Sequence, residues 1–249
     1  MRNHSKLALA ISLMVGAGAG TSIAHAQNTA TDANRTSAST NAVNNYDRDD
    51  VRNAQQQVSE STQVVSQMKR DPKLVKLLQR AQGVFIMPDF GKGAAVVGAR
   101  GGQGILLVRS ATGWQGPLFY DFGGVSVGAQ AGGAAGAVAM LLMTDKAVNS
   151  FKNNQNNWSL NANAGLTVVN YSSDAQASAG KGGDVIVWSD TEGLFAGASI
   201  GVSDIRRDDE AIRAYYKQAA TPQQIFSGTV KTPHADALKD ELPSQVAAR

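Results

Sequence analysis

The sequence predicts an α+β fold: an antiparallel β-sandwich or barrel of roughly eight strands with an N-terminal helical region and short packed helices. Three observations lead to this class. Hydrophobic residues make up 43% of the 249 residues and charged residues only 17%, as in a globular chain with a buried core. Residues 51–82 contain no glycine and have helical periodicity. Residues 83–136 instead contain 15 glycines between short apolar runs, which is typical of strands and tight turns.

The first 26 residues have the pattern of a signal peptide. Arg2 and Lys6 form a positive region, residues 7–19 form an apolar stretch, and residues 24–26 offer small side chains for cleavage before Gln27. A membrane anchor is the alternative, but the apolar run is short and glycine-rich for a span of about 20 residues. No cysteine follows, which excludes a lipoprotein. We expect a bacterial protein that is periplasmic or secreted.

Composition divides the remaining chain. Residues 27–50 are rich in Asn, Thr, Ser, Ala and Asp, so they cannot offset their ordering entropy, and we expect a flexible tether. We expect the folded domain to cover residues 51–230, helical over 51–82 and mainly strands with short helices over 83–230. Residues 231–249 form a polar tail.

The last part of the helical region is basic and amphipathic. Asp71 is a helix cap and Pro72 suits the first helical position. The apolar stripe that follows consists of Leu74, Leu77, Leu78 and Ala81. If the helix continues through the proline, a second face carries most of a run of five cations: Lys69, Arg70, Lys73, Lys76 and Arg80.

Short apolar runs predict the strands, at residues 84–87, 94–97, 105–108, 118–122 and 185–188, with alternation over 160–168 and 194–202. Three short helices are expected between or after them. One begins at Thr144-Asp145, one covers residues 208–218 with acids at its N-terminus, and one is capped by Thr221.

The ionisable residues exclude several function classes. The chain has no cysteine, and His234 is the one histidine left after signal cleavage, so we expect no metal and no cofactor. The formal charge of +3 falls by two, to +1, without the signal peptide, so nucleic acid is not an expected partner.

Two catalytic interpretations are weak. The pattern GxSxG occurs at residues 124–128 and again at 197–201, but the base available to Ser126 or Ser199 is His234 in the polar tail. Strands with closely approaching backbones explain the pattern better. A glycosidase-type carboxylate pair is possible but unsupported, because the acids stand mainly at segment ends, where turns and caps use them. These acids are Asp89, Asp121, Asp145, Asp184, Asp190, Glu192 and Asp204.

A stripe of glycines raises the question of whether residues 124–136 form a transmembrane helix or a core strand. Glycines recur every four residues from Gly124 to Gly136, inside 23 uncharged residues. Such a stripe suits packed transmembrane helices, but each glycine costs about 1 kcal/mol of helix propensity. Residues 125–131 also alternate with period two. A core strand followed by a buried apolar segment is the preferred interpretation.

Ordered sequence blocks resemble one known family. They are AQGVFIMP at 81–88, GILLVR at 104–109, PLFY at 117–120, GGVSVGAQAG at 123–132, LLMTDKA at 141–147, GLFAGAS at 193–199 and DDEAIRAYY at 208–216. Over roughly residues 51–230 the chain is similar to the SYLF family, also called the Ysc84 actin-binding-like family.

The resemblance implies a non-enzymatic lipid-binding domain. Eukaryotic members bind phosphoinositides and some bind actin, but an exported bacterial protein is not expected to meet actin. The ligand carries over as a class, anionic phospholipid at a membrane surface. The family's binding region corresponds here to the basic helix, so the candidate lipid-binding residues are Lys69, Arg70, Lys73, Lys76 and Arg80. Two alternatives remain: the leucine stripe docks on the sheet and leaves the cations merely solvated, or the protein is an envelope structural or stress protein that binds another protein through its sheet.

Overall fold

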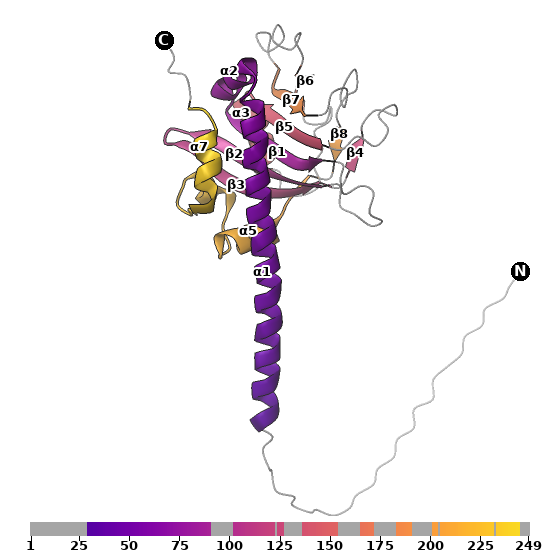
Figure 1. Cartoon of the computed structure of the whole chain (residues 1–249), viewed down its shortest axis with the longest axis vertical. Helices are drawn as coiled ribbons and strands as arrows, with labels where there is room; N and C mark the ends of the chain where they lie inside the picture. The colour runs from indigo at the N-terminus through magenta and orange to yellow at the C-terminus, as the bar shows by residue number, and fades with distance from the viewer. Residues whose placement is uncertain are drawn as a thin grey trace, which may run out of the picture. The chain divides into compact units, whose positions relative to one another are not determined.

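The structure is a computed structural model that describes residues 29–90, 102–122, 124–126, 136–153, 165–171, 183–190, 201–203, 205–231 and 233–244. The chain divides into two compact units after Ala42, and the fold lies in the second unit, from Val43 onward (Figure 1). The described helices are α1 (Thr29–Met68), α2 (Pro72–Arg80), α3 (Asp145–Asn153), α5 (Asp209–Tyr216), α6 (Pro222–Phe226) and α7 (Asp236–Glu241), with a 3-10 turn, η3 (Pro233–Ala235).

The described strands form one large sheet and one small ribbon. The sheet has seven strands in the order β6-β7-β5-β1-β2-β3-β9, and the ribbon pairs β4 with β8. The strands are β1 (Gly83–Phe90), β2 (Gly102–Ser110), β3 (Gly113–Phe122), β4 (Gly124–Ser126), β5 (Gly136–Leu142), β6 (Val168–Asn170), β7 (Val185–Ser189), β8 (Gly201–Ser203) and β9 (Arg206–Arg207).

The α+β class is confirmed, whereas closure into a barrel is not. Within the described residues the outer strands β6 and β9 do not pair with each other, so the sheet is open. Most neighbours are antiparallel, as expected, but β6 runs parallel to β7. Strand spacing along a sequence cannot distinguish an open sheet covered by helices from a closed one, which explains the difference.

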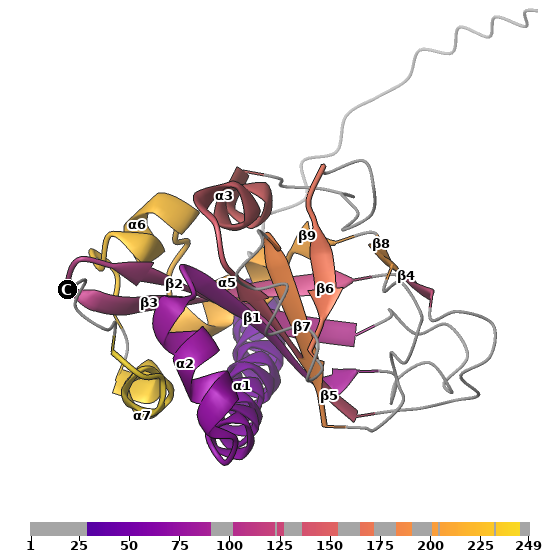
Figure 2. The ribbon, with the colours of Figure 1, turned by 90° about the horizontal axis from the view of Figure 1, so that it is seen from above.

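Helices cover both faces of the sheet. Phe85 of β1, Tyr120 of β3 and Phe151 of α3 cluster on one face, with ring centroids 4.9 Å apart for Phe85 and Phe151 and 5.7 Å for Phe85 and Tyr120. Val84 and Ile86 alternate with Phe85 and are also fully buried, on the opposite face. Figure 2 shows α3 and α6 on one side of the sheet and α1 and α2 on the other. The core is therefore sandwiched between two helical layers.

Helix α1 begins at Thr29, inside the segment that the sequence analysis expects to be a flexible tether. Residues 27–50 contain neither glycine nor proline, so nothing in them interrupts a helix. The role of this segment as a tether stays a prediction. From Ala54 onward, α1 buries a stripe of side chains that includes Val58, Val65 and Met68.

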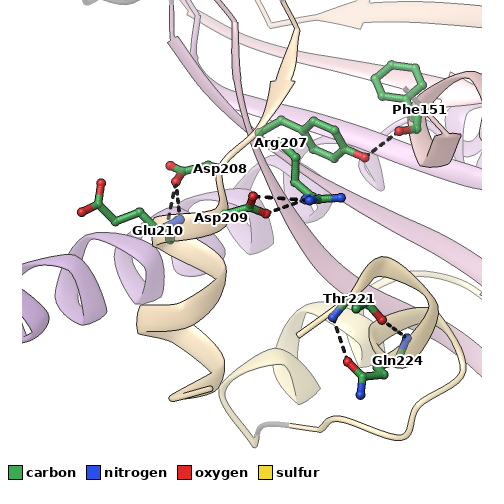
Figure 3. Close-up of polar contacts among 9 residues, drawn as sticks. Phe151, Arg207, Asp208, Asp209, Glu210, Thr221 and Gln224 are labelled. Atoms are coloured by element: carbon green, nitrogen blue, oxygen red, sulfur yellow. Dashed lines mark hydrogen bonds and ion pairs between the residues drawn. The ribbon is translucent and has the colours of Figure 1, made fainter. Parts of the chain in front are cut away.

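Helices α5 and α6 have the N-terminal caps that the sequence predicts. The Asp208 carboxylate accepts hydrogen bonds from the backbone N–H groups of Glu210 (3.1 Å) and Ala211 (2.9 Å) (Figure 3). Thr221 and Gln224 form a reciprocal capping box at the start of α6. The neighbouring Arg207 pairs with Asp209 at 2.5 Å. These contacts fix the starts of the two helices that follow β9.

The described parts of the glycine-rich region are strands. Residues 124–126 form β4 and pair antiparallel with β8, in the register Gly124 to Ser203 and Ser126 to Gly201. Residues 136–142 form β5 in the middle of the main sheet, where every residue is buried. Residues 127–135 lie outside the described residues. Among the helices that the structure describes, none is both long and apolar enough to cross a bilayer.

Candidate functional site

Helix α2 has one buried face and one exposed face. Leu74, Leu77 and Leu78 are at most 5% exposed, so the leucine stripe docks into the core. Lys73, Lys76 and Arg80 are exposed, at spacings of three and four residues. Seven residues of helix rise about 10 Å, so the three cations form a short basic ridge on the surface. This arrangement excludes insertion of the leucines into acyl chains while α2 stays docked.

The N-terminus of α2 is fixed by Asp71. Its carboxylate accepts a hydrogen bond from the backbone N–H of Lys73 at 2.8 Å, as the sequence predicts for a capping aspartate. The hydroxyl of Tyr171, just after β6, donates a hydrogen bond to the second carboxylate oxygen. The Tyr171 bond is the main cause that holds the pKa of Asp71 below its ordinary value, and the Lys73 N–H adds to it. The cap therefore stays ionised in neutral solution.

The C-terminus of α2 is fixed by a cation from the sheet. Arg109 of β2 donates through Nε to the carbonyl oxygen of Ala81 and through Nη2 to that of Leu78, both at 2.9 Å. Its guanidinium lies 4.1 Å from the ring centroid of Trp114, whose indole N–H donates to the carbonyl of Pro243 at 3.0 Å. Burial lowers the pKa of Arg109. Both helix ends are thus held by side chains distant in sequence.

Two of the five predicted lipid-binding residues lie in the turn before α2. The helix does not continue through Pro72, because α1 ends at Met68. Lys69 forms an ion pair of 3.0 Å with Glu241 of α7, which also accepts a hydrogen bond from Ser66. Arg70 lines an open groove of about 610 Å³ between α1 and the segment of η3 and α7 that contains His234. The five cations therefore do not share one helical face.

The exposed cations differ in their partners. Lys69 is partly neutralised by Glu241, and Lys73 lies close enough to Asp71 for their charges to interact. Arg70, Lys76 and Arg80 form no ion pair within the part of the chain that the structure describes. The surface over α2 and its preceding turn is consequently positive and rigidly presented, which suits an anionic partner.

The comparison with known families agrees with the resemblance read from the sequence blocks. Residues 123–245 match the model of the Ysc84 family, described as "Las17-binding protein actin regulator". The chain contains a Ysc84 (SYLF) domain. Helix α2 precedes the matched residues, but Tyr171, which bonds to its cap Asp71, lies within them. So do Glu241, which pairs with Lys69 in the turn before α2, and Pro243, which accepts a hydrogen bond from Arg109.

Curated relatives of the Ysc84 domain occur in fungi and mammals. The chain is 32% identical over 164 residues to Protein YSC84 and to LAS seventeen-binding protein 3, both of Saccharomyces cerevisiae. It is 28% identical over 174 residues to SH3 domain-containing YSC84-like protein 1 of Bos taurus. These matches cover 64% to 68% of the chain. They span 35% of the length of the yeast relatives and 50% of the bovine one.

The residues of the two catalytic interpretations have structural partners in the Ysc84 domain. Ser126 lies on β4 and is paired with Gly201 of β8. Ser199 lies outside the described residues. His234 contacts the side chain of Gln55 at 3.0 Å. Asp184 accepts hydrogen bonds from the Thr167 N–H (2.9 Å) and the Thr144 hydroxyl (2.8 Å), and both lower its pKa, the Thr167 bond more strongly. Among the described residues no group of three acids or histidines could hold a metal ion.

Sequence reasoning missed the residues that hold the basic ridge in place. Arg109 directly follows the strand predicted at residues 105–108, but nothing in the neighbouring sequence connects it with a helix end 28 residues earlier. Glu241 stands in a stretch interpreted as a polar tail, yet α7 and Leu238 pack into the core. The tail of the Ysc84 domain is therefore a structural part of the site up to the described Pro243.

Proposed function

We propose that this Ysc84 domain is a non-catalytic module that binds anionic phospholipid headgroups at a membrane surface. The observation that carries the proposal is the basic ridge of Lys73, Lys76 and Arg80, exposed on a helix whose leucines are fully committed to the core. Arg70 adds a fourth exposed cation in the preceding turn. A docked helix of this kind contacts headgroups through its charges alone.

The expected affinity is moderate and sensitive to salt. Each cation near an anionic surface contributes about 1 kcal/mol, and this attraction decays over a Debye length of about 8 Å at physiological ionic strength. Because α2 is capped at both ends in the free protein, binding does not have to pay for folding the helix. Peripheral, reversible association is the mode that follows.

Export is part of the proposal and rests on the sequence of residues 1–26. The positive region, apolar stretch and small residues before Gln27 support cleavage and release as a periplasmic or secreted protein. The available surface would then be the outer leaflet of an inner membrane or another envelope lipid. Actin is not an expected partner in that location.

Absence of catalysis is also proposed. It is supported by a family description that names binding and regulation and by the structural partners of His234 and Asp184. The rate of ester hydrolysis is measured for the parent protein and for the variants Ser126→Ala and Ser199→Ala with a panel of substrates. Equal rates in all three proteins would support the absence of a catalytic serine. A serine-dependent turnover would contradict it.

Flotation with lipid vesicles tests the proposed function. The purified protein is mixed with vesicles of neutral phosphatidylcholine or with vesicles that also contain an anionic phospholipid, over a series of salt concentrations. We expect binding to the anionic vesicles alone, weakening with salt. The double variant Lys73→Glu/Lys76→Glu should lower the affinity by roughly 30-fold or more, since two contributions of about 1 kcal/mol are lost and repulsion is added.

A matched variant controls for total charge. Arg213 and Lys217 are exposed cations on helix α5 and at its C-cap. The double variant Arg213→Glu/Lys217→Glu has the same net charge as the ridge variant. We expect it to bind anionic vesicles nearly as well as the parent protein. Equal losses in both variants, or binding independent of lipid charge, would contradict a role for the ridge.

A protein partner is the second candidate function. The family description and the name of one yeast relative both refer to binding of a protein, Las17 or LAS seventeen, by those proteins. In this case the vesicle assay would show no binding, and the ridge variant would leave the interaction with the partner unaffected if the sheet provides the contact.

A further inference from the structure

Two aromatic side chains, Tyr171 and Trp188, lie on the face of the sheet that carries α2. Register partners on adjacent strands point to the same face, and β5 aligns Ala139 with both Ile86 of β1 and Trp188 of β7. Ile86 alternates with Phe85, so Ile86 and Trp188 lie on the face away from α3. Trp188 therefore belongs to the face that α1 and α2 cover (Figure 2).

Tyr171 lies beside Trp188 on that face. The parallel register of β6 and β7 pairs Asn170 with Val187, and the next residue, Tyr171, donates its backbone N–H to the Val187 carbonyl at 2.6 Å. The hydroxyl of Tyr171 reaches the Asp71 carboxylate, which also caps the first turn of α2. One carboxylate thus joins the aromatic edge of the sheet to the start of the basic ridge.

These aromatic side chains are not fully buried in the core. Trp188, Tyr171 and Val169 are each partly exposed, whereas Val185, Ile186 and Val187 on the inner strand are buried. The indole N–H of Trp188 forms no hydrogen bond with any residue in the described ranges. We call Val169, Tyr171 and Trp188 the aromatic ledge.

We propose that the aromatic ledge is the interfacial anchor of this domain: Trp188 and Tyr171 enter the headgroup region of an anionic membrane while the adjacent cations bind its phosphates. The inference rests on the proposed function and names the second half of the same site. Tryptophan and tyrosine are favoured at membrane interfaces because one end of the ring is apolar and the other forms hydrogen bonds with water and headgroups. The indole of Trp188, whose N–H has no partner among the described residues, has this character.

The cations beside the aromatic ledge indicate which kind of partner binds there. Arg70 and Lys73 flank the Asp71 cap, so the surface beside the ledge is positive and matches an anionic bilayer. The ledge supplies apolar contact that salt does not screen, and the ridge supplies long-range attraction that salt does screen. Together they predict binding that weakens with salt but does not vanish.

Tryptophan fluorescence with brominated lipids tests the ledge directly. Bromine on the acyl chains quenches only indoles that reach the membrane. The parent protein and the variant Trp188→Phe, which keeps an aromatic ring in the sheet, are measured with anionic vesicles made of brominated or unbrominated lipid. The chain has two further tryptophans. Trp158 is replaced by phenylalanine in both proteins, and Trp114 is 6% exposed and contacts Arg109, so Trp114 contributes a constant, unquenched signal.

Flotation of the same samples separates this inference from the proposed function. We expect the parent protein to float and to be quenched, the quenching to disappear in Trp188→Phe, and Trp188→Ala to bind about tenfold more weakly because the apolar contact is lost. If the parent protein floats with anionic vesicles but Trp188→Phe is quenched as strongly as the parent, the ledge does not reach the membrane. The proposed role of the ridge would then still stand. Failure to float at all would overturn both.

Discussion

Arg109 on strand β2 donates a 2.9 Å hydrogen bond to the carbonyl oxygen of Ala81, the C-cap residue of helix α2. The last carbonyls of a helix have no intrahelical partner and carry partial negative charge. A guanidinium that binds two of them, those of Ala81 and Leu78, satisfies these groups and aligns the helix with the sheet. The surface position of the basic ridge thus depends on a half-buried cation beneath it.

Replacement of Arg109 by methionine should destabilise the domain and loosen α2. Methionine is a long side chain but donates no hydrogen bond to the carbonyls of Ala81 and Leu78, and hydrogen bonds to charged groups contribute about 1.5–3 kcal/mol. We expect the free energy of unfolding, measured by urea denaturation with circular dichroism, to fall by about 2 kcal/mol or more.

The control for this prediction is Arg213→Met on α5. Arg213 is exposed, so its loss should change the free energy of unfolding by no more than about 0.5 kcal/mol. Equal stability of the Arg109 variant and its parent would mean that the two hydrogen bonds are replaced by water and do not hold α2.

The local features of α2 could be predicted from the sequence because each depends on neighbouring residues. Asp71 and Pro72 predict the start of the helix, and both occupy the cap and the first turn. The leucine spacing predicts the buried stripe, and Leu74, Leu77 and Leu78 are buried. A glycine after a helix is typical of a helix end, but Gly83 begins β1, where a Cβ atom would lie 3.2 Å from the Leu107 carbonyl oxygen.

The long-range features could not be predicted, because they depend on where distant segments meet. Lys69 looks like one member of a basic run until the fold brings Glu241 to it from α7. The aromatic ledge contacts the N-terminal cap of α2 through the hydrogen bond of Tyr171 to Asp71, two residues that lie 100 positions apart in the sequence. Strand count alone likewise leaves an open sheet and a barrel equally consistent with the sequence.

Removal of the Tyr171 hydroxyl should destabilise the domain in a manner that depends on pH. Tyr171→Phe removes the hydrogen bond that is the main cause of the lowered pKa of Asp71. A lowered pKa in the folded state adds stability above the unfolded pKa of about 3.9, and this stability is lost as the pH falls through the folded value. We expect Tyr171→Phe to cost about 1–2 kcal/mol near neutral pH and progressively less below about pH 4.

Tyr215 provides the matched control. Its hydroxyl is buried and has no hydrogen-bond partner among the described residues, so Tyr215→Phe should be neutral or stabilising across the same pH range. Urea denaturation at a series of pH values measures both variants. Parallel pH curves for Tyr171→Phe and the parent would show that the hydroxyl does not act through the ionised cap.

Gly104 should not accept a methyl group. A Cβ atom at this position of β2 would lie 2.4 Å from Cζ of Phe85 and 3.1 Å from Cγ of Met87. Phe85 cannot move away easily because it packs against Tyr120 and Phe151. Gly104→Ala should therefore lower the free energy of unfolding by about 1–3 kcal/mol, measured by thermal or urea denaturation.

A smaller side chain at position 85 tests whether overlap with the Phe85 ring causes the loss of stability in Gly104→Ala. If steric overlap with the ring is responsible, Gly104→Ala combined with Phe85→Leu should lose less stability than the sum of the two single variants. The neighbouring Gln103→Ala, at an exposed position of the same strand, should change stability by less than about 0.5 kcal/mol. Simple additivity in the double variant would indicate that the overlap is relieved elsewhere.

Release of Lys69 from its partner should strengthen membrane binding under the proposed function. Glu241 accepts the ion pair from Lys69, and that contact is the main cause of the lowered pKa of Glu241, so the acid stays charged at neutral pH. Glu241→Gln removes this negative charge beside the ridge. One additional uncompensated cation should increase the affinity for anionic vesicles about fivefold at low salt, while the loss of a partly exposed pair costs no more than about 1 kcal/mol of stability.

Asp240→Asn is the control for that variant, because Asp240 is exposed on the same helix and the charge change is identical. We expect a smaller gain in vesicle affinity from Asp240→Asn than from Glu241→Gln, since only Glu241 contacts Lys69. The gain from Glu241→Gln should also disappear at acidic pH, where the parent carboxylate becomes protonated and the two proteins carry the same charge at this position. Equal gains from both variants would mean that vesicle binding responds to net charge, and not to the availability of Lys69.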